Sequence, residues 1–279
     1  MNSNGHDNVE RDIVFARGGD MDLKLNVFKP AEGTSKRTAI VHLHGGGFRG
    51  GNKEAVERTA NHLVERGYVC VNSQYRVADQ GKWPAQIEDA KAAIRWTRAN
   101  SERLGIDPDK IVVAGYSAGA HLSLNVAGNM GRGDYEGTGG NNDVSSDVAA
   151  CIAYYPPTTT VKTANIMPPD ATDDFAHDAS PLTHVGANMP PTLLMHATGD
   201  TTLPYTGSVA IFDKLRAAGV PVELHLFDGL SHVFDRHPEF AAPAAEICDL
   251  FLDRHVVDPR TYPPFEGGAP ATPAAAAAR

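Results

Sequence analysis

The sequence predicts an α/β fold in which a mostly parallel central sheet begins with an antiparallel hairpin and carries helices on both faces. Two observations predict this fold. Short apolar segments alternate with longer segments of helical periodicity through most of the 279 residues, as they do where helices connect the strands of a buried parallel sheet. The two N-terminal segments instead alternate apolar and polar residues around a glycine turn, which is typical of a hairpin.

The hairpin is expected from residues 11–16 and 22–28, which flank Arg17-Gly18-Gly19-Asp20. Further strands are expected in the short segments that are continuously apolar or rich in β-branched residues, namely 38–43, 68–72, 110–115, 148–155, 192–197 and 222–227. Helices are expected between them at 53–66, at 84–100, from Ser117 onward, at 205–218 and at 238–254. Gly67 ends the first of these helices and Pro84 opens the second.

Three segments lack a regular period. Residues 131–147 are rich in Gly, Asn and Asp and are expected to form a surface loop. Residues 156–191 contain many prolines and turn residues, which predicts a small irregular lid with short helices at most. Residues 263–279 are rich in Pro and Ala and are expected to be a disordered tail. No linker divides two cores, so residues 1–262 are expected to form a single domain.

Composition excludes several classes of function. The hydrophobic fraction of 42% suits one sizeable core, and the net charge of −9 disfavours binding to nucleic acid or to an anionic membrane surface. No apolar segment approaches the ~18 residues that would insert into a membrane, and the polar N-terminus lacks the apolar core of a signal peptide, which favours a cytoplasmic protein. No metal-binding or nucleotide-binding motif is present, so we expect no metal and no cofactor. The three cysteines are too widely spaced for a disulfide framework or a zinc site: Cys70, Cys151 and Cys248.

The segment Gly115-Tyr116-Ser117-Ala118-Gly119 has the pattern G-x-S-x-G. It stands between a predicted buried strand and a predicted helix, which is the setting that this pattern requires. A sharp turn there forces the serine toward unfavourable backbone angles and exposes its hydroxyl at the carboxyl edge of the sheet. The N-terminus of the following helix offers N–H donors to developing negative charge. We therefore predict that Ser117 is a nucleophile.

Three consecutive glycines follow the first central strand, in His44-Gly45-Gly46-Gly47. Because glycine has no Cβ, such a loop can turn its N–H groups inward. Together with the N–H of Ala118, these groups would form an oxyanion hole. The sequence leaves open which two of the three glycines donate.

A serine nucleophile requires a base, and the base requires an acid that orients it. After a serine in this setting, the acid comes next along the chain and the histidine follows it. Asp200 lies just past the carboxyl end of the strand predicted at 192–197, and His232 lies in a loop after the strand predicted at 222–227. We predict that Asp200 is the acid and His232 the base.

The rival candidates have structural interpretations. Asp228 belongs to an Asp-Gly turn, and His196 and His225 lie inside predicted strands. His121 lies four residues after Ser117 on the same predicted helix, so we expect it to make a supporting hydrogen bond rather than to act in catalysis.

Several motifs together resemble the α/β-hydrolase esterases, and more narrowly the compact branch of the hormone-sensitive-lipase-like group that holds bifunctional feruloyl and acetyl-xylan esterases. The resemblance spans about residues 10–254 and rests on His44-Gly-Gly-Gly-Phe48, Tyr75-Arg76, Pro84-Ala-Gln-Ile-Glu-Asp89, Ile106-Asp-Pro-Asp-Lys-Ile111, Gly115-Tyr-Ser-Ala-Gly-Ala-His-Leu122, Ser180-Pro-Leu-Thr-His-Val185 and Gly199-Asp200. It implies an α/β-hydrolase fold, a homodimer as one possible state, and no cofactor. It also implies the triad and oxyanion hole formed by Ser117, Asp200, His232, Gly45, Gly46, Gly47 and Ala118.

Two positions depart from the pattern of the larger group. Tyr116 stands where Asp or Glu is usual, and Ala120 stands where a second Gly is usual, which favours the compact branch. Only 43 residues precede His44, so the helical N-terminal cap of larger relatives is expected to be missing. Cover over the site would then come mainly from residues 156–191. The candidate substrate contacts are Phe48, Tyr116, Leu203 and Pro204.

The expected function is hydrolysis of small carboxylic esters, with short acyl chains, by a serine hydrolase that forms an acyl-enzyme. Two alternatives stay open. An amidase or arylformamidase would use the same triad, although arylformamidase relatives often carry an aromatic residue where this chain has Gly47. A non-catalytic ligand-binding protein of the same fold usually lacks a triad member, whereas all three are present. The sequence leaves the acyl and alcohol parts of the substrate open.

Overall fold

The computed structural model describes residues 8–159 and 166–263. Its described residues form one eight-stranded sheet with the order β1-β2-β4-β3-β5-β6-β7-β8. The strands are β1 (Val9–Gly18), β2 (Met21–Phe28), β3 (Ala39–Leu43), β4 (Val69–Ser73), β5 (Ile111–Tyr116), β6 (Ala150–Tyr154), β7 (Thr192–Ala197) and β8 (Val222–Phe227). The predicted α/β fold is confirmed.

The sheet changes direction between β2 and β4. β1 pairs antiparallel with β2, from Val9 opposite Phe28 to Gly18 opposite Met21, and β2 pairs antiparallel with β4. All pairs from β4 through β8 are parallel. β3 and β5 lie at the centre and every residue in them is buried, whereas β8 is an edge strand of the described sheet in which no residue is fully buried.

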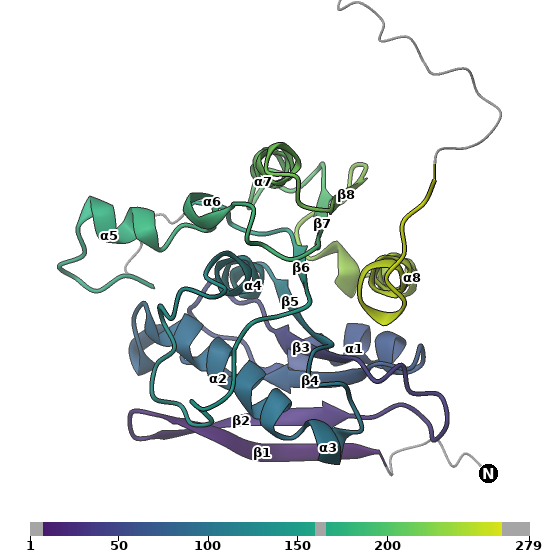
Figure 1. Cartoon of the computed structure of the whole chain (residues 1–279). Helices are drawn as coiled ribbons and strands as arrows, with labels where there is room; N and C mark the ends of the chain where they lie inside the picture. The colour runs from purple at the N-terminus through teal and green to yellow at the C-terminus, as the bar shows by residue number, and fades with distance from the viewer. Residues whose placement is uncertain (1–7, 160–165, 264–279) are drawn as a thin grey trace, which may run out of the picture.

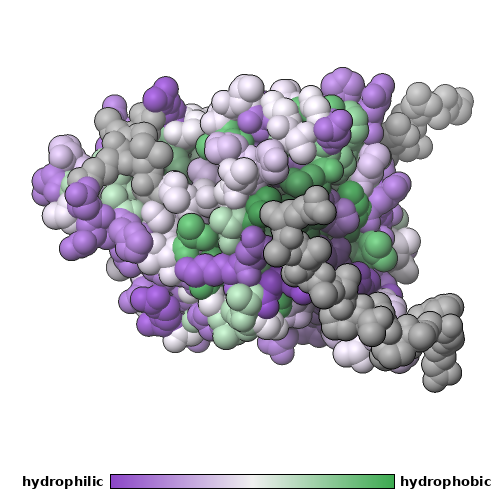
Figure 2. Space-filling model, turned by 90° about the horizontal axis from the view of Figure 1, so that it is seen from above, coloured by the Kyte–Doolittle hydropathy of each residue, from purple (hydrophilic) through white to green (hydrophobic). Residues whose placement is uncertain are grey.

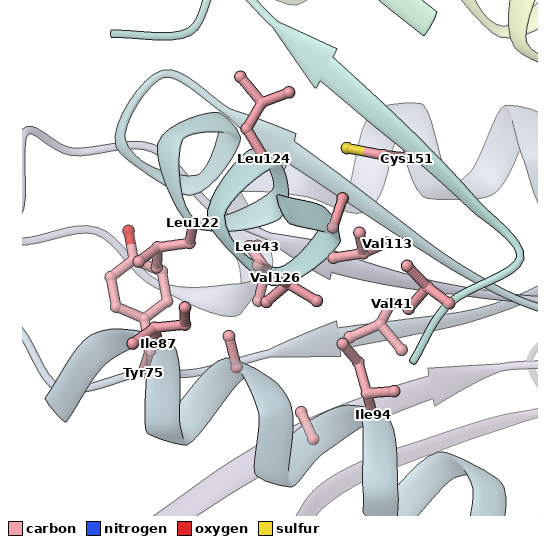
Figure 3. Close-up of a cluster of buried hydrophobic side chains, with 14 of the residues drawn as sticks. Val41, Leu43, Tyr75, Ile87, Ile94, Val113, Leu122, Leu124, Val126 and Cys151 are labelled. Atoms are coloured by element: carbon pink, nitrogen blue, oxygen red, sulfur yellow. The ribbon is translucent and has the colours of Figure 1, made fainter. Parts of the chain in front are cut away.

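Helices cover both faces of the sheet (Figure 1). One face carries α2 (Ala85–Ala99), α4 (Ala118–Gly128) and α7 (Thr206–Ala217), and the other carries α1 (Glu57–Val64) and α8 (Pro238–Leu252). Figure 3 shows the first of the two apolar layers, where Ile94 of α2 lies near Val41 of β3, and Ile87 of α2 lies near Tyr75 and Leu122. Because helices bury both faces, the inner strands are continuously apolar rather than alternating.

Some elements differ from the sequence prediction. The helix expected at 53–66 begins as a 3-10 turn, η1 (Lys53–Val56), before α1, because the side chain of Asn52 accepts a hydrogen bond from the N–H of Ala55 at 3.0 Å and caps that turn. Four short elements that the sequence analysis did not predict are α3 (Ser101–Leu104), the 3-10 turns η2 (Ala78–Gln80) and η3 (Phe234–Arg236), and the π turn η4 (Asp253–Val257).

The loop at residues 131–147 is tied to α2 by ion pairs that the sequence analysis did not foresee. Lys91 and Arg95 belong to α2, and each side chain is only 1% exposed. Their cationic groups lie 2.8 Å and 2.7 Å from the two carboxylate oxygens of Glu136 in the loop. Burial of these cations is tolerated because each is paired and hydrogen-bonded.

The segment 156–191 contains the short helices α5 (Asp173–Asp178) and α6 (Pro181–His184). α5 lies at one end of the molecule, away from the sheet (Figure 1), and hydrophilic residues predominate at that end in the view from above (Figure 2). Residues 160–165 of the predicted lid and residues 264–279 of the predicted tail lie outside the described residues. Within the described chain, no helix combines the length and the apolar character needed to cross a bilayer.

Candidate active site

Ser117 stands in a strained turn between β5 and α4. Its backbone angles are φ 53° and ψ −114°, a region that costs an L-residue about 1–3 kcal/mol. The turn requires the two flanking glycines. A Cβ on Gly119 would lie 1.9 Å from the carbonyl oxygen of Leu43, and a Cβ on Gly115 would lie 2.0 Å from the carbonyl oxygen of Gly119. The glycine spacing that predicted Ser117 is therefore explained by the close contacts that Gly119 makes with β3 and that Gly115 makes with α4.

The three residues predicted as nucleophile, base and acid lie in one hydrogen-bonded line. Nε2 of His232 lies 3.0 Å from Oγ of Ser117, and Nδ1 of His232 lies 2.6 Å from Oδ2 of Asp200. Because a carboxylate only accepts, Nδ1 carries the proton and Nε2 is free to accept the proton of the serine hydroxyl. This is the geometry of a nucleophile, a general base and an orienting acid.

Asp200 is held in the ionised form. Its Oδ1 accepts hydrogen bonds from the backbone N–H groups of Thr202 at 2.8 Å and Leu203 at 2.9 Å. Burial acts to raise the pKa of Asp200, but the hydrogen bonds from Leu203 and His232 outweigh it and keep that pKa below its usual range. A carboxylate that stays charged can stabilise a cation on His232.

The glycine loop after β3 lies against the nucleophile. A Cβ on Gly45 would come within 3.4 Å of Cβ of Ser117, and Gly46 and Gly47 both have positive φ, at 135° and 59°. No hydrogen bond between described residues uses the N–H of Gly46 or Gly47. Ala118 is the first residue of α4, so its N–H has no partner within the helix. These donors are free for an oxyanion.

A tyrosine and a histidine brace this loop. The ring of His44 stacks on the ring of Tyr75 with 4.3 Å between centroids, and the hydroxyl of Tyr75 donates to the carbonyl oxygen of His44 at 2.7 Å. Nδ1 of His44 donates to the carbonyl oxygen of Gly45 at 2.8 Å. Burial lowers the pKa of His44 to about 4, so this ring is neutral at neutral pH.

A cavity of about 290 Å³ opens beside the triad. It is lined by Gly45, Gly46, Gly47, Ala55, Val56, Tyr116, Ser117, Tyr155, Thr202, His232, Val233, Asp235 and Arg236. Of the four candidate substrate contacts, only Tyr116 is among these residues, and its hydroxyl points away to Nδ1 of His42 at 3.2 Å. Leu203 and Pro204 are not among the lining residues, and Phe48 is 8% exposed and packs edge-to-face on His121.

The structure adds two residues that no sequence motif indicates, because they are far apart in the chain. The ring of Tyr155 meets the ring of His232 edge-to-face, with 4.6 Å between centroids. The hydroxyl of Tyr155 donates to Oδ1 of Asp235 at 2.5 Å, and burial raises the pKa of Asp235. Asp235 follows His232 by three residues, so this bond ties the loop of the base to the end of β6.

Two of the rival residues, His121 and Asp228, have partners outside the triad. Nδ1 of His121 donates to the carbonyl oxygen of Pro157 at 3.2 Å, so the supporting bond expected near Ser117 goes instead to the start of segment 156–191. Asp228, in the turn after β8, accepts from the hydroxyl of Thr198, which follows β7, at 3.1 Å. No group of three or more His, Cys, Asp or Glu side chains in the described part of the chain is arranged to hold a metal ion.

Comparison with known proteins gives one family and many relatives. The family model BD-FAE matches residues 25–215. Two proteins of Mycobacterium tuberculosis are similar: the probable carboxylic ester hydrolase LipM, 28% identical over 86% of this chain and 60% of its own length, and the esterase LipC, 29% identical over 85% of this chain and 63% of its own length. This chain thus spans about 60% of the length of the curated relatives that it matches.

The solved structures that are similar include a thermophilic esterase from Thermogutta terrifontis. Its butyrate-bound form superposes with a TM-score of 0.78 at 28% identity and covers 91% of this chain and 97% of that chain. The form phosphorylated by paraoxon superposes with a TM-score of 0.78 at 30% identity, with the same coverage. The shared architecture extends over almost the whole of that esterase.

Proposed function

This chain belongs to the BD-FAE family, and we propose that it is a serine hydrolase that cleaves carboxylic esters with the triad Ser117, His232 and Asp200. The observation that carries this proposal is the unbroken line of hydrogen bonds from Oδ2 of Asp200 through His232 to Oγ of Ser117. Relatives with the names of esterases and carboxylic ester hydrolases support it.

Acylation begins when Oγ of Ser117 attacks the ester carbonyl carbon. Nε2 of His232 takes the hydroxyl proton, and Asp200 stabilises the imidazolium that results. The carbonyl oxygen becomes an oxyanion and receives the free N–H groups of Gly46, Gly47 and Ala118. Loss of one such donor typically costs about 3 kcal/mol in the transition state. The intermediate collapses, the alcohol leaves with the proton from Nε2, and the acyl group stays on Oγ.

Deacylation repeats these steps with water. His232, neutral again, takes a proton from water, and the resulting hydroxide attacks the acyl carbon of the ester on Ser117. The same donors hold the second oxyanion. The carboxylic acid leaves when Oγ recovers its proton from Nε2. Atoms and charge balance over the cycle without a cofactor.

Short acyl chains fit the site best. The cavity beside Ser117 and His232 has a volume of about 290 Å³, which is at the small end for ligand sites. The similar esterase of Thermogutta terrifontis has been solved with butyrate and with propionate bound. We propose that esters of acetate to butyrate are hydrolysed faster than longer ones.

The test is hydrolysis of p-nitrophenyl esters of increasing acyl length, with Ser117→Ala as the matched variant and the corresponding p-nitroanilides as amide substrates. We expect turnover of the acetate to butyrate esters that the variant loses. Paraoxon should transfer one diethylphosphoryl group to the wild type and none to Ser117→Ala, which intact-mass measurement detects. A folded wild type that hydrolyses only the anilides would favour an amidase, and one inert to esters, anilides and paraoxon would favour a binding protein.

A further inference from the structure

The acid of the triad is in contact with a second histidine. His196 lies in β7, four residues before Asp200. Its Nε2 lies 3.2 Å from Oδ2 of Asp200, the same oxygen that His232 contacts, and 3.0 Å from the carbonyl oxygen of Leu203. The side chains of His196 and Asp200 are both fully buried. Two imidazoles from different elements therefore share one carboxylate oxygen.

The neighbours of His196 fix its protonation state. Both groups near Nε2 are acceptors, so Nε2 carries the proton. Nδ1 is then an acceptor, and it lies 2.8 Å from Oγ of Ser208 in α7, whose hydroxyl donates to it. Burial lowers the pKa of His196, which agrees with a neutral ring. One series of hydrogen bonds thus runs from Ser208 through His196 to Leu203, whose N–H donates to Asp200, and His232 contacts the same carboxylate.

We propose that His196 is a positioning residue for the triad, which holds Asp200 at the oxygen that His232 also contacts and limits how strongly the carboxylate attracts a proton onto His232. This inference rests on the proposed function, since it assigns a role within the same triad. The contact with Leu203 serves the same purpose. Leu203 donates its N–H to Oδ1 of Asp200 and accepts from His196 at its carbonyl oxygen, so His196 fixes both the carboxylate and the turn that orients it.

The expected effect on His232 has a definite sign. The Nε2–H of His196 is bonded to the carbonyl oxygen of Leu203 and lies 3.2 Å from Oδ2 of Asp200. Its partial positive charge offsets part of the carboxylate charge, so less of that charge stabilises the imidazolium of His232. Without that N–H, the carboxylate stabilises the imidazolium of His232 more strongly. The titratable groups that face His232 are Asp200 from the loop after β7, Tyr155 from the end of β6 and Asp235 from its own loop. His196 faces it across Asp200.

The informative pair of variants is His196→Leu and His196→Gln. Leucine fills similar space without a donor, whereas the amide of glutamine can place an N–H where Nε2 stands. We expect His196→Leu to lower kcat on the order of 10-fold to 100-fold, because a displaced orienting group misplaces the base, with KM nearly unchanged. In the pH profile of kcat/KM, the fall on the acid side (the acid limb) should move to higher pH. His196→Gln should recover most of kcat and return the acid limb toward its original position.

A buried histidine outside the triad serves as the control. His42 in β3 is fully buried and contacts Tyr116 rather than a triad residue. His42→Leu should lower stability to a similar extent, measured by thermal unfolding, without moving the acid limb. If His196→Leu does not fold, Ser208→Ala provides the test, because it frees Nδ1 of His196 and should lower kcat and shift the acid limb in the same direction by less.

Two outcomes overturn the inference. One is that His196→Leu and His196→Gln lose activity equally while the acid limb stays in place, since a purely structural role predicts this result. The other is that His196→Leu keeps wild-type kcat. If the wild type itself shows no ester hydrolysis that depends on Ser117, the proposed function fails and the role of His196 fails with it, and the Ser117→Ala comparison separates that case from the first two.

Discussion

Ser117 and its proposed oxyanion donors directly follow the two central strands, β3 and β5, whereas the proposed acid and base, Asp200 and His232, stand on loops after the last two strands, β7 and β8. We call the first group the nucleophile half and the second the acid–base half. Backbone geometry holds the nucleophile half, through glycines that allow contacts closer than any Cβ would permit. Side-chain contacts hold the acid–base half: His196 lies 3.2 Å from Asp200, and the hydroxyl of Tyr155 donates to Asp235. The hydrogen-bonded series from Ser117 to Asp200 therefore depends on close backbone contacts at one end and on side-chain contacts at the other.

The comparison predicts that a substitution in the acid–base half removes activity while the protein stays folded. Asp200→Asn should lower kcat by about 10⁴-fold, because an amide in place of the carboxylate favours the wrong tautomer of His232. Steady-state kinetics with a p-nitrophenyl ester would measure this loss, and circular dichroism would show an intact fold. A loss of folding comparable to the loss of activity would contradict the division into two halves.

Acid should destabilise the fold through buried histidines near the nucleophile half, and His196 in the acid–base half acts in the same direction. Burial lowers the pKa of His42 to about 3 and those of His44 and His121 to about 4, whereas in the unfolded chain each has a pKa of about 6.5. The unfolded state therefore binds more protons below that pH, and stability falls as pH falls from about 6.5 toward 4, by up to about 1.4 kcal/mol per pH unit for each histidine.

Urea unfolding between pH 7.5 and pH 4.5 would measure this slope. The raised pKa of Asp235 acts in the opposite sense, because its protonated form is favoured in the folded state. His121→Asn should reduce the slope of the unfolding free energy against pH by the contribution of one histidine. A slope that is unchanged in this variant would show that His121 titrates normally in the folded protein.

Adding one methyl group in the nucleophile half should lower the free energy of unfolding, and activity should fall as a consequence. Gly119→Ala places a Cβ 1.9 Å from the carbonyl oxygen of Leu43, so β3 and α4 must move apart, at a cost of about 3 kcal/mol. Gly105→Ala is the control, since its φ is 68° but a Cβ there meets nothing within 4 Å, and it should cost only about 1 kcal/mol. Thermal unfolding of both variants measures the difference, and equal losses would show that the close contact is relieved without strain.

The smallest expected effect concerns the support of His232. Tyr155→Phe keeps the ring against His232 but removes the donor to the buried carboxyl of Asp235, which should cost about 1–2 kcal/mol of stability and lower kcat by less than about tenfold. Asp235→Asn keeps an acceptor for Tyr155 and should stay closer to the wild type in both respects. If Asp235→Asn is the more damaging variant, the charge of Asp235 matters rather than its hydrogen bond.

The same division explains what the sequence could predict. Ser117 and Gly45 to Gly47 are visible because close backbone contacts require glycine at fixed spacing, and Asp200 and His232 follow from their order along the chain. Asp235 leaves no such pattern, because its hydrogen bond with Tyr155 joins residues far apart in the chain and imposes no local spacing. His196 is only four residues from Asp200, but its place inside a predicted strand does not indicate that its ring reaches the acid. Lys91 and Arg95 were missed for a related reason, since buried cations depend on a partner that only the folded chain brings near.

The edge position of β8 has a consequence for how the molecule responds to warming. A half-exposed edge strand opens with a lower free energy than a central one, and β8 leads directly to His232. Each transient opening would withdraw the base while β3 and β5 keep Ser117 in place. The amides of β8 should therefore exchange with deuterium before those of β5, and reversible loss of turnover should precede melting of the sheet. The upper temperature at which the protein works is then set by one peripheral strand and not by the stability of the whole.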